Sequence, residues 1–178
     1  MANDHIAELK KWANELAHRK DEYETVEWIR AVELISKSFG VKTHEVAVLG
    51  LTKDERSLRF LAPDTLRAVG QIPLSSASAL ASRTVREMRP EIVNHFHAVP
   101  HATVFEGVPI AVDERGDPIQ KIMSSPVVIN DKAIGVIQVS RKGKTAAEAG
   151  PDFTPPQLRT LKLISDVLVP CLVLSAKK

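Results

Sequence analysis

Apolar residues near the start of the chain recur at the spacing of a helix. Ile6, Leu9, Ala13 and Leu16 alternate between steps of three and four residues, which places them in one narrow stripe along a helix with polar residues around it. Two interpretations fit a stripe of this length. Either the helix packs on its own domain, or the stripe forms a seam between two copies of the chain.

Two internal segments also have a helical pattern. The apolar stripe from Trp28 to Phe39 is followed by Gly40, a residue suited to end a helix in the left-handed conformation. Residues 75–88 predict a second helix, which Pro90 stops. The residues expected to face inward on this second helix are Ala79, Leu80, Val85 and Met88, with Ser76 as its cap.

The last helix has the clearest start signals in the chain. Thr154 stands at the N-cap, Pro155 at the first helical position and Gln157 three residues after the cap, the arrangement of a capping box. Pro170 removes one backbone hydrogen bond and crowds the preceding turn, so we expect this helix to kink near its end.

Six other segments have the pattern of β-strands, either alternating or apolar on both sides. They are residues 44–52, 57–61, 71–74, 91–96, 119–129 and 133–142. The first is apolar on both faces, which predicts that both faces of the sheet are covered. The turn Asn130–Lys132 joins the last two. Gly135 within the last strand predicts a close backbone approach or a bulge.

Composition places the chain among ordinary soluble proteins and narrows the classes of partner. A length of 178 residues predicts one domain, and a net charge of +2 gives no reason to expect a nucleic-acid partner. The most apolar run, Val167–Leu174, is shorter than a membrane span, and the charged N-terminus lacks the apolar core of a secretion signal. The single cysteine, Cys171, fits a reducing compartment. We therefore expect a cytoplasmic protein with no membrane contact.

Three of the six histidines lie close together in the segment NHFHAVPHATVFEG. On a strand, His95 and His97 would point to the same face, and His101 would follow from the loop, which is a spacing that zinc or iron can use. The alternatives are histidines at the rim of a pocket, where imidazole donates or accepts hydrogen bonds, and plain surface histidines. The aperiodic segment 98–118 has no regular structure to hold His101, which weakens the metal interpretation.

Motifs for catalysis are missing from the sequence. It has no glycine-rich phosphate loop and no Ser-His-Asp motif. Ser124 and Ser125 have no neighbouring base in a recognisable motif, and a serine nucleophile needs activation. We therefore predict no catalytic residue and expect no cofactor.

The order of these elements, together with two sequence patterns, resembles a known family. The decisive pattern is Ser125-Pro126-Val127-Val128, a turn, Ile134-Gly135-Val136-Ile137, and then Phe153-Thr154 at the start of a terminal helix. A weaker one lies in IPLSSASALASRTVREMRPEIVNHF. The chain from about Thr25 to Leu174 thereby resembles a GAF domain, the small-molecule sensor module of signalling proteins.

The resemblance implies an α+β fold, a profilin-like twisted antiparallel sheet of five or six strands. The N- and C-terminal helices would cover one face, and a ligand pocket would lie on the other. It implies a division into an N-terminal helix, residues 1–20, which is a possible dimer seam, and a GAF-like sensor domain, residues 21–178. The elements that would converge on the pocket supply these candidate residues: Phe60, Leu74, Leu80, His95, His97, Phe105 and Met123.

The resemblance also implies a regulatory domain rather than an enzyme. Some GAF-like proteins reduce methionine sulfoxide with several cysteines, and others attach a bilin to a cysteine, but this chain has only Cys171. The signature of the cyclic-nucleotide subgroup is absent from the sequence. We expect an unidentified small-molecule ligand, a homodimer and a signalling partner. A ligand-free dimerisation scaffold is the alternative.

Overall fold

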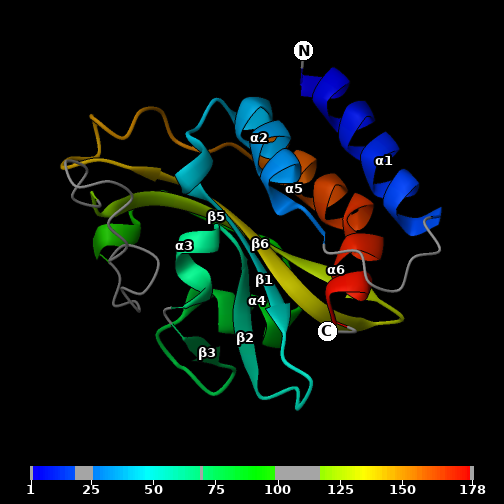
Figure 1. The fold of residues 1–178 in the computed structure, drawn as a ribbon. Coiled ribbons are helices and arrows are strands. Elements are labelled where there is room, and N and C mark those ends of the chain that lie inside the picture. Colours follow the sequence, from blue (N-terminus) through cyan, green and yellow to red (C-terminus); the bar gives the residue numbers. More distant parts are fainter. Residues whose placement is uncertain (1, 19–25, 69, 99–116, 177–178) are drawn as a thin grey trace.

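The computed structural model describes residues 2–18, 26–68, 70–98 and 117–176. These residues form one six-stranded sheet with helices packed against it (Figure 1). The strands are β1 Val46–Leu51, β2 Ser57–Ala62, β3 Gln71–Pro73, β4 Glu91–Val93, β5 Ile119–Ile129 and β6 Lys132–Lys142. They lie in the order β3-β2-β1-β6-β5-β4, and every neighbouring pair is antiparallel. The predicted antiparallel sheet of five or six strands is confirmed.

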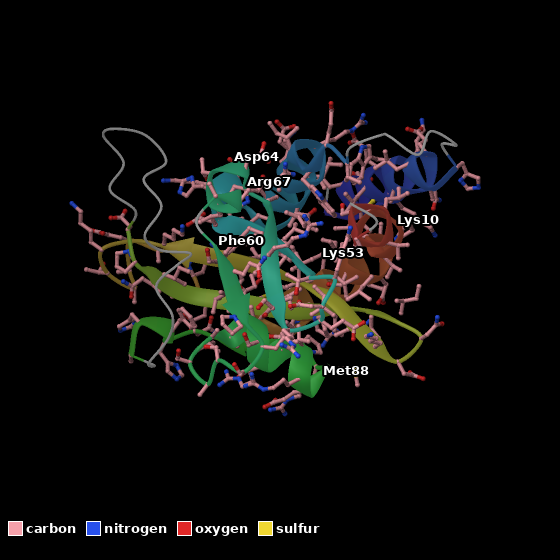
Figure 2. All side chains as sticks on the ribbon, turned by 60° about the horizontal axis from the view of Figure 1, so that its bottom comes forward. Lys10, Lys53, Phe60, Asp64, Arg67 and Met88 are labelled. Atoms are coloured by element: carbon pink, nitrogen blue, oxygen red, sulfur yellow. The ribbon has the colours of Figure 1, made fainter. Side chains whose placement is uncertain are left out.

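Helices cover both faces of this sheet. The helices are α1 Ala2–His18, α2 Trp28–Phe39, α3 Asp64–Arg67, α4 Leu80–Glu87, α5 Pro155–Val167 and α6 Val169–Ala176, with the short 3-10 turns η1 Thr43–Glu45 and η2 Phe96–Ala98. The terminal helices α1, α2, α5 and α6 lie on one face, and α4 lies on the other. Figure 2 places Lys10 of α1 and Met88, just after α4, on opposite sides of the sheet.

The alternation of side chains along the strands produces two separate apolar cores. Val48 and Ile137 point toward the terminal helices, whereas their neighbours Leu49 and Val136 point toward α4 and η2. All four side chains are fully buried. The strand that is apolar on both faces therefore has a covered face on each side, as the sequence predicts.

The N-terminal stripe packs within its own chain. Leu9, Ala13 and Leu16 are buried in the core that α1 shares with α2 and α6. The ring of Trp12 meets that of Trp28 edge to face, with the centroids 6.5 Å apart. The structure therefore agrees with a helix that packs on its own domain. A seam between two copies would need the same side chains at the surface.

Several local predictions agree with the structure. Gly40 ends α2 in the left-handed conformation. At the start of α5, the backbone N–H of Thr154 donates to Oε1 of Gln157 at 3.0 Å. The terminal helix is interrupted at Leu168, two residues before Pro170, and continues as α6.

Two segments differ from their prediction. Helix α4 begins at Leu80 rather than at residue 75, because Ser76 lies in a turn where its Oγ accepts from the N–H of Ala79 at 3.1 Å. Met88 adopts the left-handed conformation after α4 and is 48% exposed, so its expected inward position is wrong. Strand β4 ends at Val93 rather than at residue 96.

Candidate functional site

A hollow of about 260 Å³ opens on the face of the sheet opposite the terminal helices. It lies between the segment that leads into α4 and the segment from β4 to η2. Leu80, Val93 and Phe96 form its apolar walls, and all three are buried. The polar groups that line it are Arg83, Glu91 and His95, together with Ser78. A small hollow that combines apolar walls with a few polar groups has the composition of a ligand site.

Arg83 and Glu91 form a two-pronged ion pair on the wall of the hollow. Nη2 of Arg83 lies 2.8 Å from Oε1 of Glu91, and Nε donates to Oε2 at 3.2 Å. The arginine projects from α4 and the glutamate from the first residue of β4. Both side chains are about one-third exposed, at 36% and 29%. The paired geometry fixes both groups in orientation while leaving them accessible.

His95 lies in the turn after β4, where the chain leaves the sheet. Its carbonyl accepts from the N–H of Ala98 at 3.1 Å, which closes the turn of η2. His95 is exposed and lines the hollow, whereas His97, within η2, is exposed and does not line it. The expectation that both rings point to one face of a strand is wrong, because the strand has already ended.

A row of buried polar groups lies on this face of the sheet, beneath α4. The hydroxyls of Thr84 and Ser124 are 2.7 Å apart, and Nε2 of Gln138 donates to the Ser124 hydroxyl at 3.2 Å. Thr84 also donates to the carbonyl of Leu80 at 2.9 Å. Ser124 thus contacts a hydroxyl and an amide, neither of which is a base strong enough to activate it. It is a structural group that joins α4 to β5 and β6.

The sequence predicts no catalytic role for Ser124 and does not predict this row. A signal was present, since Ser124 and Gln138 face the same apolar core as Ile122 and Val136. A polar residue at such a position needs a partner, because an unpaired buried hydroxyl costs about 1–3 kcal/mol. The sequence does not say which helix supplies that partner.

The structure brings only some of the candidate residues together. Leu80 and His95 line the hollow. Phe60 and Leu74 belong to the same apolar core without lining the hollow. Met123 lies on the other face of the sheet, fully buried in the core of the terminal helices. Its place on the pocket side was wrong because strand alternation turns it away from its neighbours Ile122 and Ser124.

Two candidates, Phe105 and His101, lie outside the described residues. In the described parts of the chain, no three or more His, Cys, Asp or Glu side chains are grouped in a way that holds a metal ion. Glu91, which would serve a metal site as an outer carboxylate, is engaged by Arg83 instead. In the same parts of the chain, no helix is both long and apolar enough to cross a bilayer.

The single cysteine is remote from the hollow. Cys171 is fully buried among the terminal helices on the opposite face of the sheet. Burial disfavours the thiolate and raises the pKa of Cys171 to about 12. A thiol in this state is a poor nucleophile at neutral pH.

Solved structures match nearly the whole chain. The GAF domain of a phosphoenolpyruvate-protein phosphotransferase from Acinetobacter is 13% identical, with a TM-score of 0.65 over 97% of this chain and 93% of that one. The A. aeolicus nlh2 GAF domain, solved in an inactive state, is 10% identical, with a TM-score of 0.62 over 98% and 99%. The chain has a GAF fold. No family model matches its sequence, and no curated protein does.

An enzyme is also among the solved structures that match this chain. The free methionine-R-sulfoxide reductase from Neisseria meningitidis, solved with its substrate, is 12% identical to this chain. Its TM-score is 0.66 over 99% of this chain and 91% of that one. The fold of this chain therefore occurs in GAF domains and in a reductase, and identities this low establish the fold alone. The function of this chain has to be argued from its own residues.

Proposed function

We propose that this GAF-fold chain is a regulatory domain that binds a small polar molecule in the hollow between α4 and β4. The observation that carries the proposal is the position of the Arg83–Glu91 pair and His95 around the buried side chains of Leu80 and Phe96. Fixed polar groups above an apolar floor orient a ligand that has both hydrogen-bond donors and acceptors.

The size of the hollow favours a small ligand. Its volume of about 260 Å³ lies just below the range of about 300–1,000 Å³ that is usual for drug-sized molecules. An amino acid or a keto acid fits this volume better than a cyclic nucleotide or a haem does. Arg83 and His95 supply donors for a carboxylate, and Glu91 supplies an acceptor for an amine or hydroxyl.

The proposal is for binding without catalysis. Reduction of a sulfoxide by thiols needs a reactive thiolate and a second thiol to resolve the product. Cys171 is the only cysteine in the sequence. It is buried on the face of the sheet opposite the hollow, and its pKa is raised to about 12. Neither a cofactor nor a metal is part of the proposed function.

For signalling, ligand binding in the hollow has to change a contact with a second copy of the chain or with another protein. With the stripe of α1 buried, the outer side of α5 is the surface we propose for this contact, because Leu163 is 57% exposed there. Light scattering at micromolar concentration tests the homodimer. A dimer that Leu163→Asp converts to monomers supports this surface, and a monomeric wild-type chain leaves only a partner protein.

The ligand is sought first by thermal shift with amino acids, keto acids, purines, cyclic nucleotides and haem at high concentration. Stabilisation grows as RT ln(1 + [L]/Kd), so a weak ligand also raises the melting temperature. We expect at least one amino or keto acid to do so. A chain that responds to none of these classes is better described as a ligand-free dimerisation scaffold.

Matched variants then locate the site by calorimetry with the compound that the screen identifies. His95→Ala and Arg83→Gln are expected to weaken binding at least tenfold, about 1.4 kcal/mol. His97→Ala and Arg89→Gln are the controls, because His97 is exposed without lining the hollow and Arg89 pairs with Glu87 at the surface. Equal affinities for all four variants would exclude the hollow as the binding site.

A further inference from the structure

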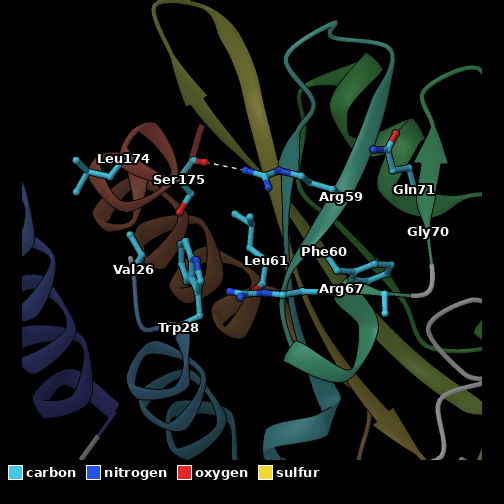
Figure 3. Close-up of a pocket in the computed structure, with 11 residues that line it drawn as sticks. Val26, Trp28, Arg59, Phe60, Leu61, Arg67, Gly70, Gln71, Leu174 and Ser175 are labelled. Carbon is cyan, nitrogen blue, oxygen red and sulfur yellow. Dashed lines mark hydrogen bonds between the residues drawn. The ribbon is translucent and has the colours of Figure 1, made fainter. Parts of the chain in front are cut away.

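A second pocket, of about 420 Å³, opens at the outer edge of the sheet. Strand β3 pairs with β2 only as far as Arg59, so the last three residues of β2 extend beyond it. The pocket lies beside this extension, between β2, the start of α2 and the end of α6 (Figure 3). We call it the β2-edge pocket. It shares no lining residue with the hollow between α4 and β4.

One wall of the β2-edge pocket is apolar and aromatic. Trp28 and Leu61 are buried parts of the core beneath the terminal helices. Val26 and Leu174 add aliphatic surface from the segment before α2 and from α6. The indole of Trp28 is held by its edge contact with Trp12. This wall is suited to the flat or aliphatic body of a ligand.

Two arginines line the same pocket. Figure 3 shows Arg59 and Arg67 on either side of Leu61, both directed toward the side of the pocket where Trp28 and Ser175 lie. The lining contains these two cations and no carboxylate. Glu27, which precedes Trp28 in the chain, is exposed and does not line the pocket. The pocket therefore has a net positive charge next to an apolar wall.

Backbone carbonyls hold both guanidinium groups in place. Nη2 of Arg59 donates to the carbonyl of Ser175 at 2.7 Å. Arg67 donates from Nε and Nη2 to the carbonyl of Leu61, at 3.1 and 3.0 Å. Asp64 lies 3.1 Å from Nε of Arg67, but its side chain is 82% exposed, so water screens this pair strongly.

Each guanidinium has donors to spare. A guanidinium carries five N–H groups, and within the described parts of the chain Arg59 and Arg67 have no hydrogen-bond partner for Nη1. Because carbonyls already fix the orientation of both groups, little side-chain freedom is lost when an anion binds.

We propose that the β2-edge pocket binds an organic anion. Its carboxylate or phosphate accepts hydrogen bonds from Arg59 and Arg67, and its apolar body lies against Trp28 and Leu174. Two arginines recognise either anion through charge-assisted hydrogen bonds, and the apolar wall distinguishes an organic anion from the inorganic ion. This site is independent of the hollow beside α4 and does not rest on the function proposed for it.

The test is an NMR titration of the full chain with four probes: phenyl phosphate, benzoate, inorganic phosphate and benzyl alcohol. We expect phenyl phosphate or benzoate to shift the indole N–H of Trp28 and the backbone amides of Gln71 and Ser175 in a saturable way. Inorganic phosphate is expected to bind at least tenfold more weakly, because it lacks the apolar body. Benzyl alcohol, which lacks the charge, is expected to bind at least tenfold more weakly as well.

Two sets of variants decide whether the charge and the location are correct. Leu174→Glu places a carboxylate in the pocket without removing either arginine, and we expect it to lower the affinity for phenyl phosphate and benzoate at least tenfold. Met88→Glu, at an exposed position after α4 that lines neither pocket, is its control. The double variant of Arg59→Gln and Arg67→Gln is expected to abolish saturable shifts, whereas Arg89→Gln leaves them unchanged.

Wild-type affinity in the Leu174→Glu variant would overturn the proposal, since that variant keeps both arginines and their carbonyl contacts. Equal binding of benzyl alcohol and phenyl phosphate would also overturn it, because the pocket would then select for apolar surface alone. Binding in the hollow beside α4 is read from different amides, those of Ser78 and His95. Failure of one site is therefore distinguishable from failure of the other.

Discussion

The side-chain amide of Asn94 makes two hydrogen bonds with the backbone of Phe153. Its Oδ1 accepts from the N–H of Phe153 at 2.9 Å, and its Nδ2 donates to the carbonyl of Phe153 at 3.0 Å. Asn94 immediately precedes His95, and Phe153 immediately precedes the N-cap of α5. One amide therefore connects the turn that carries His95 to the segment leading into α5.

Asn94→Ala should destabilise the chain. It leaves the N–H and carbonyl of Phe153 without their partner, and each group left unsatisfied costs about 1–3 kcal/mol when it is buried. Both groups are only partly buried. We therefore expect the free energy of unfolding, measured by urea denaturation, to fall by about 1–3 kcal/mol in total. Asn14→Ala, at an exposed position of α1, is the control and should change the stability by less than about 0.5 kcal/mol. Equal stabilities for the two variants would show that the hydrogen bonds of the Asn94 amide do not stabilise the fold.

Gly135→Ala should be more damaging than a surface substitution. A Cβ at Gly135 would lie 2.3 Å from the carbonyl oxygen of Leu49 and 2.3 Å from Cδ2 of Leu172. The leucine side chain can move, but the carbonyl belongs to the neighbouring strand β1, so the strands have to separate. We expect a loss of about 3 kcal/mol, the upper end for an overpacked core, measured by thermal or urea unfolding. Gly70→Ala has open space but a positive φ of 127°, so the backbone strain of that variant can be compared with the clash in Gly135→Ala.

The pair of hydroxyls beneath α4 can be tested with a double-mutant cycle. Thr84→Val and Ser124→Ala each remove one partner of the 2.7 Å hydrogen bond. Because both residues are fully buried, we expect each single variant to cost about 1–3 kcal/mol. The two losses should not add, with a coupling of at least about 0.5 kcal/mol. Strictly additive losses would mean that the two hydroxyls are stabilised separately, Thr84 by the carbonyl of Leu80 and Ser124 by Gln138.

The buried thiol predicts a specific loss of stability in alkali. Burial raises the pKa of Cys171 to about 12, above the value of about 8.5 for an exposed cysteine. Between these values the unfolded chain releases the thiol proton and the folded chain retains it, so stability falls as the pH rises. The contribution of the Cys171 thiol to the free energy of unfolding is complete below the pKa of the unfolded chain. Above that pKa it decreases by up to about 1.4 kcal/mol per pH unit.

The comparison that isolates this thiol is with Cys171→Ala, because that variant lacks the thiol and keeps every other titratable group. The wild-type chain should lose stability faster than the variant between about pH 9 and pH 12. Identical pH slopes would mean that the thiol is accessible to solvent. The native thiol should also react with an aromatic disulfide at pH 8 only as fast as the chain opens.

The sequence predicts the fold well where local signals agree with the tertiary structure. Gly135 predicted a close backbone approach or a bulge, and the structure confirms the close approach, because a Cβ there would meet the carbonyl oxygen of Leu49. The capping residues Thr154 and Gln157 place the start of α5 correctly, since a capping box acts within four residues.

The candidate site could be predicted only in part, because it depends on where short elements end. His95 and His97 were placed on one face of a strand, but β4 stops at Val93, and only His95 reaches the hollow. The partner of Glu91 was also missed. A sequence separation of eight residues gives no sign that Arg83 reaches back across the turn at Pro90 to form an ion pair. Pairs of this kind depend on how α4 packs over β5 and β6, which no local pattern encodes.

The last prediction concerns the stripe on α1, for which the sequence allowed two interpretations. Leu9 is 1% exposed in the core beneath α1, and Leu16 is also buried there. Leu9→Asp therefore buries a carboxylate without a partner, and we expect it to lower the unfolding free energy by more than about 3 kcal/mol. Ala7→Asp, two residues earlier on the exposed side of the same helix, should have little effect. Urea denaturation measures both variants, and light scattering measures their mass. If Leu9→Asp keeps full stability and only halves the mass of a dimer, the stripe is a seam between copies after all.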